Sequence, residues 1–246
     1  MNRDQLRRAV RSARAYARRP GRLPEFLIIG GQRCGTTSLY RYLADHPSVR
    51  PAIGKELQYF SLHHDRGERW YRGHFPRRPD AVRSFEASPY YLFDPAVPAR
   101  VAATLPAARF VALVRDPVER AWSHYLHSRR YGIEPLSFAD ALDAEPERLA
   151  SGGRREYSYQ ARGFYAEQLE RWYAAIDPAR ILVVRTERLN TDYPAILDFL
   201  GLPPHVPADF GRHTRRTGDA PVPAELRDRL IATFAADQAR LDRLLP

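Results

Sequence analysis

The stretch FLIIGGQRCGTTSLY, residues 26–40, restricts the possible folds more than any other part of the chain. It begins with four apolar residues, which is typical of a parallel strand that is covered on both faces. Gly30 and Gly31 then allow a tight turn, and Thr36, Thr37 and Ser38 open a helix. A strand, a glycine turn and a helix start in this order predict a loop that binds an anion with the N–H groups and the dipole of the helix.

The loop differs from the nucleotide-triphosphatase pattern in the position of its cation. Gly30 and Gly35 have the spacing of that pattern, but Thr36 stands where the pattern requires lysine. The positive charge lies inside the loop instead, at Arg33. We therefore expect the loop to bind a phosphate ester other than a magnesium-bound triphosphate.

Strands and helices are expected to alternate along the chain. Apolar runs predict strands at 26–29, 84–87, 109–114 and 181–184. Helical patterns occupy about 36–45, 96–104, 117–131, 137–149, 163–176, 192–200 and 223–245, whereas 50–80 is expected to form loops. This order predicts an α/β fold, a doubly wound and mostly parallel sheet with a P-loop-like strand–loop–helix, and a ligand at the carboxyl ends of the strands.

The formal charge of +10 is concentrated at the N-terminus. Residues 1–24 contain eight arginines and one acidic residue, Asp4, so the rest of the chain is only mildly basic. We expect a basic N-terminal segment, 1–24, followed by a single domain over 25–246, and no nucleic acid partner. The segment is either a solvated helix with frayed ends or a contact with an anionic membrane surface or polymer.

Several classes of protein are disfavoured by the composition. Cys34 is the one cysteine, which excludes an internal disulfide framework. No stretch approaches the ~20 apolar residues of a membrane span, and the first residues are too charged for a signal peptide, so a cytoplasmic protein is expected. The histidine pairs 63–64 and 124/127 have no third ligand at a recognisable spacing, so no metal is expected.

A second cation is expected near the loop. The strand 109–114 stops at Arg115, and Ser123 lies two turns into the helix that follows. In a parallel sheet both would lie at the same edge as the loop, which suggests a nucleotide with two separated phosphate groups. A structural ion pair between Arg115 and Asp116 is the alternative.

At this point the chain resembles the sulfotransferases, and most of all the branch with the heparan sulfate N- and 3-O-sulfotransferases and their bacterial relatives. The resemblance covers residues 25–245. It is carried by GGQRCGTTSL at 30–39, KELQYF at 55–60, EASPYY at 86–91, RDPVERAWSHY at 115–125, GFYAEQLERW at 163–172 and ERL at 187–189.

The resemblance implies a sulfotransferase domain over 25–246 that moves a sulfuryl group from 3′-phosphoadenylyl sulfate (PAPS) to a hydroxyl or amine of a glycan or small-molecule acceptor. It implies catalytic roles for Glu56, as the base, and for Arg33. The implied donor contacts are Arg33, Cys34, Gly35, Thr36, Thr37 and Ser38 for the 5′-phosphosulfate, Arg115 and Ser123 for the 3′-phosphate, and Arg215 and Arg216 in a closing loop. The implied acceptor contacts are Lys55, Gln58, His63, Ser88 and Tyr90.

Three residues depart from the family pattern. Arg33 stands where many relatives have lysine, and a guanidinium stabilises charge but is a poor proton donor at neutral pH. Ala87 and Gln58 replace a lysine and a histidine that are common in the heparan-modifying branch, so heparan itself is not assumed as the acceptor.

Two other functions remain open from the sequence. A small-molecule kinase could use the same loop, but it would require magnesium and ATP, and the missing lysine argues against it. An anionic-polymer binder could use the arginine-rich segment 1–24.

Overall fold

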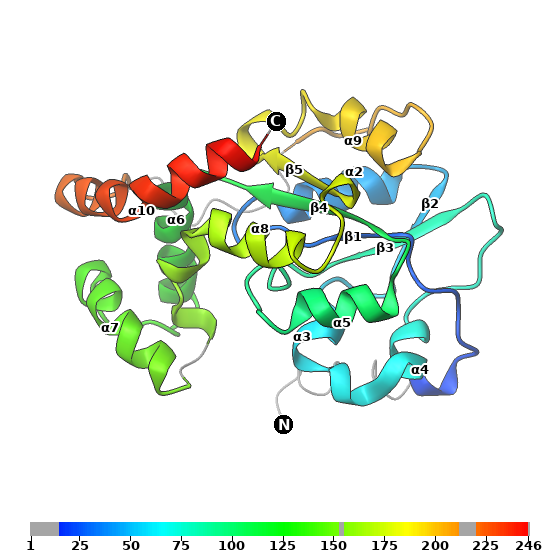
Figure 1. The fold of residues 1–246 in the computed structure, drawn as a ribbon, viewed down its shortest axis with the longest axis horizontal. Helices are drawn as coiled ribbons and strands as arrows, with labels where there is room; N and C mark the ends of the chain where they lie inside the picture. The colour runs from blue at the N-terminus through cyan, green and yellow to red at the C-terminus, as the bar shows by residue number, and fades with distance from the viewer. Residues whose placement is uncertain (1–14, 153–154, 212–219, 246) are drawn as a thin grey trace.

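A parallel sheet of five strands lies at the centre of the computed structural model, which describes residues 15–152, 155–211 and 220–245 (Figure 1). The strands are β1 (Phe26–Ile28), β2 (Val49–Pro51), β3 (Arg83–Ala87), β4 (Arg109–Val114) and β5 (Ile181–Arg185). Their order in the sheet is β2-β3-β1-β4-β5, and every pair is parallel. The predicted α/β fold with a parallel sheet is confirmed.

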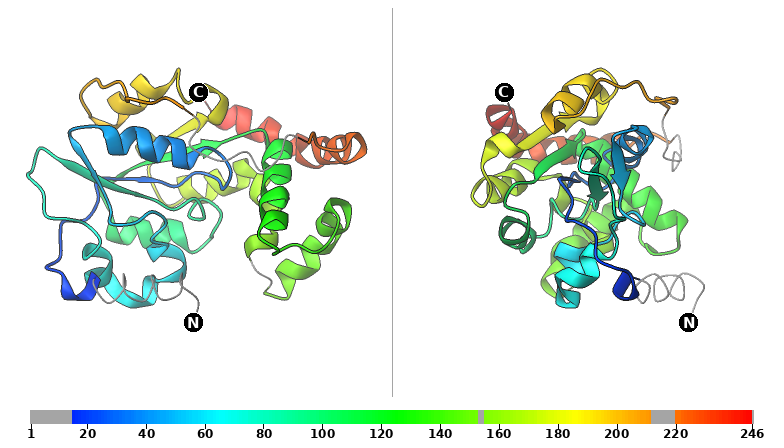
Figure 2. Two further views of the ribbon diagram at one scale, coloured as in Figure 1. Left: turned by 180° about the vertical axis from the view of Figure 1, so that it is seen from behind. Right: turned by 90° about the vertical axis from the view of Figure 1, so that its right-hand side faces the viewer.

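Helices cover both faces of this sheet, and others lie beyond its carboxyl edge. They are α2 (Thr36–Asp45), α3 (Tyr59–Leu62), α4 (Gly67–Arg72), α5 (Val97–Thr104), α6 (Pro117–Arg130), α7 (Phe138–Ala150), α8 (Tyr165–Tyr173), α9 (Tyr193–Leu200) and α10 (Ala224–Leu244). Figures 1 and 2 show α2 on one face and α5 and α8 on the other, as a doubly wound fold requires.

The central strands are buried because they carry almost only apolar side chains. All three residues of β1 and five of the six residues of β4 are buried. Phe26 stacks on Phe85 of β3 with 5.0 Å between ring centroids, and Trp172 of α8 packs against Phe110 at 5.5 Å. This core fixes the carboxyl ends of β1, β3 and β4 at one edge.

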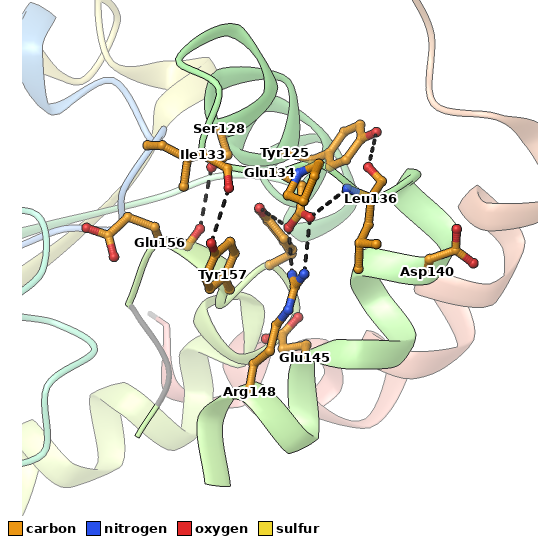
Figure 3. Close-up of polar contacts among 12 residues, drawn as sticks. Tyr125, Ser128, Ile133, Glu134, Leu136, Asp140, Glu145, Arg148, Glu156 and Tyr157 are labelled. Carbon is orange, nitrogen blue, oxygen red and sulfur yellow. Dashed lines mark hydrogen bonds and ion pairs between the residues drawn. The ribbon is translucent and has the colours of Figure 1, made fainter. Parts of the chain in front are cut away.

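A second apolar cluster lies beyond that edge, where α6, α7 and one half of α10 meet (Figure 1). Its members include Tyr125, Phe138 and Phe234. Figure 3 shows Arg148 reaching from α7 to the buried Glu134, with 2.7 Å between Nη1 and Oε2. The two helices and the chain that follows them are thereby held in one arrangement.

The prediction that 50–80 forms only loops is wrong. The segment contains the end of β2, α3, a single 3₁₀ turn at His64–Arg66, and α4. These elements have three to six residues, and β2 exists because it pairs with β3, Val49 opposite Arg83. Such short elements have too few residues to show a periodic pattern.

The described part of the N-terminal segment, residues 15–24, lies against α4. Ala15 is buried, and the Tyr16 hydroxyl donates to the carbonyl of Arg66 at 3.0 Å. The Gly21 N–H donates to the carbonyl of Arg72 at 3.1 Å, and Arg72 Nε returns a bond to the Gly21 carbonyl at 2.8 Å. Within the described residues, no helix combines the length and the apolar character that crossing a membrane requires.

Candidate functional site

A cavity of about 610 Å³ opens at the carboxyl edge of the sheet. Its walls come from the segments that follow β1, β4 and β5, together with the loop before α3. Of the residues expected at a site, those that line this cavity are Arg33, Gly35, Thr36, Thr37, Ser38, Lys55, Glu56, Arg115 and Ser123. The fold therefore brings together residues that are up to 90 positions apart in the chain.

The loop after β1 is shaped by close backbone packing. A Cβ atom at Gly30 would overlap the backbone of Leu113 in β4, so only glycine allows the two segments to approach this closely. Gly35 precedes α2 with a φ of 80°, in the left-handed region. The first amides of a helix have no acceptor within the helix, so the start of α2 offers N–H donors to an anion.

Cys34 faces away from this cavity. Its side chain is fully buried, with Sγ 3.4 Å from the Tyr165 hydroxyl, and burial raises the pKa of the thiol. The Cys34 N–H donates to the carbonyl of Gly31, and its carbonyl accepts from the Thr186 hydroxyl at 2.8 Å. The side chain of Cys34 therefore lies in the core, where it shapes the loop, and the expected contact of Cys34 with a donor stays a prediction.

Arg33 and Ser123 meet across the cavity. Arg33 adopts a φ of 72°, and its Nε donates to the Ser123 hydroxyl at 3.0 Å. Arg115 lies nearby and contacts Glu119 at 3.7 Å, whereas Asp116 caps α6 by accepting the Glu119 N–H at 2.8 Å. The alternative of an Arg115–Asp116 ion pair is therefore not what the structure contains.

Several lining residues were not foreseen as site residues. They are Gln32, Tyr42, Pro89, His127, Thr186, Glu187, Leu189, Asn190 and Phe210. His127 lies one turn after Ser123 on α6, and burial, together with Arg33, lowers its pKa. Tyr42 closes the far wall by donating to the carbonyl of Phe210 at 2.8 Å. In the sequence, His127 is indicated only by its spacing from Ser123. Glu187 and Leu189 are indicated only by the short motif ERL at 187–189.

Glu56 lies at the mouth of the cavity in a strained segment. Glu56 and Gln58 have φ values of 59° and 56°, a backbone region that costs roughly 1–3 kcal/mol for a residue other than glycine. The Glu56 carboxylate pairs with Lys55 at 2.8 Å, and its side chain is 48% exposed. The carboxylate is therefore accessible both to solvent and to a molecule in the cavity.

A smaller cavity of about 100 Å³ adjoins the first and shares Gln32, Glu56 and Pro89 with it. Gln58, Tyr90, Glu156 and Arg162 complete its walls. The Arg162 guanidinium lies over the ring of Tyr90, with 4.9 Å from Cζ to the centroid, and donates to the Gln32 side chain. Two of the expected acceptor contacts, Gln58 and Tyr90, thus line the same small cavity.

The chain around Glu156 is held by the contacts in Figure 3. The Ser128 hydroxyl donates to the carbonyl of Glu156 at 3.4 Å, and the Tyr157 hydroxyl donates to the carbonyl of Ile133 at 3.2 Å. These bonds join the segment before α8 to the end of α6. They fix one wall of the smaller cavity.

The other expected contacts have different surroundings. His63 packs edge-on against Trp70, with 5.7 Å between ring centroids, and is not among the described residues that line either cavity. Ser88 is fully buried, and its hydroxyl donates to Glu86 and accepts the N–H of Gln58, so its expected contact with the acceptor stays a prediction. Arg215 and Arg216 lie outside the described residues.

Glu86, at the carboxyl end of β3, was missed. It is fully buried and accepts hydrogen bonds from the hydroxyls of Tyr71 at 3.0 Å, Tyr91 at 2.7 Å and Ser88 at 3.1 Å. Burial raises its pKa to about 7, although the three hydroxyls and the N–H of Leu57 oppose the shift. The sequence shows only an acidic residue at a strand end, since its partners come from α4 and from the loops on both sides.

The arrangement can bind anions and move a proton. The loop amides, Arg33 and Arg115 supply positive potential on one side of the cavity, and Glu56 supplies a carboxylate at its mouth. Within the described ranges, no three or more His, Cys, Asp or Glu side chains are grouped closely enough to hold a metal ion. The donor set therefore fits a nucleotide with separated anionic groups that is held by N–H groups and guanidiniums.

Comparisons with known proteins give one consistent result. The model of the sulfotransferase domain family matches residues 23–215. The chain is 33% identical over 199 residues to the human bifunctional heparan sulfate N-deacetylase/N-sulfotransferase 3, covering 75% of this chain and 23% of that protein. It is 36% identical over 190 residues to the human heparan sulfate glucosamine 3-O-sulfotransferase 3B1, covering 73% of this chain and 46% of that protein.

The similarity extends to a solved structure. The crystal structure of a sulfotransferase from Alicyclobacillus acidocaldarius superposes with a TM-score of 0.80 at 30% identity, covering 91% of this chain and 96% of that one. The two curated relatives are much longer, and this chain spans between about a quarter and a half of their lengths.

Proposed function

This chain belongs to the sulfotransferase domain family, and from that premise we propose that it transfers a sulfuryl group from PAPS to a hydroxyl or amine of a glycan or small-molecule acceptor. One observation carries the proposal. The anion-binding loop, a second cation next to a hydroxyl, and an accessible carboxylate all line one cavity. A nucleotide with a 5′-phosphosulfate and a 3′-phosphate needs the first two, and deprotonation of an acceptor needs the third.

The donor side would be held by two groups of residues. Arg33, Thr36, Thr37 and the amides at the start of α2 would hold the 5′-phosphosulfate and stabilise the charge that develops on the departing phosphate. Arg115 and Ser123 would hold the 3′-phosphate. Because a sulfuryl group carries less negative charge than a phosphoryl group, fixed N–H donors and guanidiniums can suffice where a phosphoryl transfer enzyme uses a metal.

The acceptor side would be served by Glu56. Its carboxylate would take the proton from the acceptor hydroxyl or amine as the new bond to sulfur forms and the bond from sulfur to the phosphate oxygen breaks. Lys55, 2.8 Å away, would orient the carboxylate before the acceptor arrives. Gln58 and Tyr90 would contact the acceptor in the smaller cavity.

The relatives indicate the chemical class of the acceptor only in part. The names of the curated relatives specify heparan sulfate, a glycan, as the molecule on which those proteins act. This chain has Gln58 and Ala87 where that branch commonly has a histidine and a lysine. Screening glycans and small alcohols and amines with labelled PAPS would therefore identify the acceptor.

Calorimetric titration tests the donor. We expect 3′,5′-phosphoadenosine to bind with micromolar affinity, and ATP with magnesium to bind more weakly. Arg115→Ala should weaken the binding of 3′,5′-phosphoadenosine by roughly tenfold or more, since a charged hydrogen bond contributes about 1.5–3 kcal/mol. Arg69→Ala, on the exposed side of α4, is the matched control and should change nothing.

Transfer assays with a Glu56 variant test the base. Glu56→Gln should keep the affinity for 3′,5′-phosphoadenosine and lose transfer by about 10²–10⁴-fold. Tight ATP binding without a response to the 3′-phosphate would favour the kinase alternative instead. Full transfer activity in Glu56→Gln would remove Glu56 from the mechanism.

A further inference from the structure

The buried carboxylate of Glu86 lies directly beneath the segment that carries Glu56. Glu86 is the last residue but one of β3, and residues 55–58 cross over that strand end, where the Glu56 N–H donates to the carbonyl of Ala87 at 3.0 Å. Leu57, between the two strained residues, lies close enough to the Glu86 carboxylate to oppose the rise of its pKa. The buried group therefore lies against the segment that carries Glu56.

Two of the hydroxyls that donate to Glu86 also accept backbone N–H groups of the residues that follow Glu56. Ser88 donates to Glu86 and accepts the N–H of Gln58 at 3.2 Å. Tyr91 donates to Glu86 and accepts the N–H of Phe60 at 3.3 Å. One carboxylate thus orients the acceptors of two amides, those of Gln58 and Phe60.

This connection matters because the segment would not keep its shape alone. Glu56 and Gln58 both have left-handed backbone conformations, which residues other than glycine keep only where their surroundings enforce them. The enforcing groups are rigid, since Tyr71 stacks on Tyr59 with 4.3 Å between ring centroids and Tyr91 is fully buried. The side chain of Glu56, in contrast, pairs with Lys55 at the cavity mouth, and no other ion pair of this carboxylate is found among the described residues.

We propose that Glu86 is a positioning residue, which holds the strained segment 56–60 so that the Glu56 carboxylate faces the acceptor. The proposal rests on the proposed function only for the role of Glu56 as base. The hydrogen bonds that connect Glu86 to the segment do not depend on that role. Glu86 itself touches neither the donor nor the acceptor, because it is fully buried.

The first test measures the segment without any assay of transfer. In Glu86→Gln the amide has one acceptor oxygen in place of two, so at least one of the three hydroxyls that donate to Glu86 loses its acceptor. Hydrogen exchange should become faster in peptides spanning 56–60 and stay unchanged in those spanning 26–40. Asp237→Asn is the matched control, because Asp237 is also a buried carboxylate that accepts two amides, those of Ala166 and Glu167 in α8.

The second test measures transfer to an acceptor identified by the screen. Glu86→Gln should lower kcat by roughly 10- to 100-fold, as misplacement of a reacting group does, while the affinity for 3′,5′-phosphoadenosine stays within about twofold. The double variant Glu56→Gln/Glu86→Gln should be no slower than Glu56→Gln alone, because Glu86 acts through Glu56. Losses that multiply in the double variant would overturn the proposal.

Each outcome is decisive for one of the two claims. Unchanged exchange over 56–60 in Glu86→Gln overturns the positioning role, whatever the enzyme transfers. Faster exchange together with no transfer from PAPS by the wild type retains the structural link and rejects the proposed function. If Glu86→Gln does not fold, Ser88→Ala and Tyr91→Phe each remove one of the relayed bonds and should speed exchange at Gln58 and Phe60 respectively.

Discussion

Arg33 joins two parts of the site with one side chain. Its backbone belongs to the loop after β1, and its Nε donates to Ser123 on α6. Binding of a donor nucleotide would require this guanidinium to turn toward the leaving phosphate. The charge matters for that role, and the ability to give up a proton does not, because a guanidinium stays protonated at neutral pH.

Substitution at Arg33 separates charge from geometry. Arg33→Ala should lower kcat by about 10²–10³-fold, the usual loss when one donor to a developing negative charge is removed. Arg33→Lys keeps the charge and should lose no more than about tenfold. Steady-state kinetics with labelled PAPS gives both values, and equal activity of the wild type and Arg33→Ala would contradict the electrostatic role.

The residues that could be predicted are those whose motif is continuous in the sequence. Arg33, the loop residues 35–38 and the pair Arg115 and Ser123 all line one cavity, whereas Cys34 does not. Glu86 and Asn190 could not be predicted, since their roles depend on segments that meet only in the fold. The burial of Ser88, directly after β3, could not be predicted for the same reason.

At the scale of elements, the contact between the loop and β4 limits what the sequence can tolerate. Gly30 is needed for close approach and not for its backbone angles. Gly132, after α6, is needed instead for its backbone angles, since its φ is 66° and no atom lies within 4 Å of an added Cβ.

These two glycines give a matched pair of substitutions. Gly132→Ala should lower the free energy of unfolding by about 1 kcal/mol through backbone strain alone. Gly30→Ala should cost more, about 2–3 kcal/mol, because β1 and β4 must separate, and it should also weaken binding of 3′,5′-phosphoadenosine. Urea unfolding measures both, and equal losses would show that the approach of Gly30 to Leu113 is not limiting.

The longer elements were predictable and the shortest were not. Helix α2 and strand β4 have the predicted bounds, 36–45 and 109–114, because their patterns extend over several turns or over a continuous apolar run. β2, α3 and α4 were missed, since pairing with β3 and packing among aromatic side chains decide their structure. In these short elements, tertiary contacts decide the structure, and the local sequence pattern does not.

For the whole molecule, two buried groups give opposite pH dependences of stability. Burial lowers the pKa of His124 well below its ordinary value of 6.5, so below that pH the unfolded chain takes up a proton that the folded protein does not. This contribution makes stability rise with pH. Glu86, with a pKa raised to about 7, is protonated in the folded protein and ionised in the unfolded chain between about 4.5 and 7, so its contribution falls with pH.

The variant Glu86→Gln should therefore change the slope of the profile. Without the Glu86 contribution, the free energy of unfolding should rise more steeply between pH 4.5 and 6.5, by up to about 1.4 kcal/mol per pH unit relative to wild type. The phenols of Tyr71 and Tyr91 stay protonated throughout, because burial raises the pKa of each well above its ordinary value. Urea unfolding at a series of pH values checks the slope, and parallel profiles would contradict it.

The two adjoining cavities have a consequence for how such a protein can diversify. Among the described residues they share Gln32, Glu56 and Pro89, while the larger is otherwise built from the ends of β1, β4 and β5 and the smaller from the segments at 58, 90 and 156–162. Tyr90 and Glu156 belong to the second set and do not line the larger cavity, so changes there alter the smaller cavity first. If the larger cavity holds the donor as proposed, descendants of one ancestral gene can keep its lining while selection alters the molecule that enters beside it.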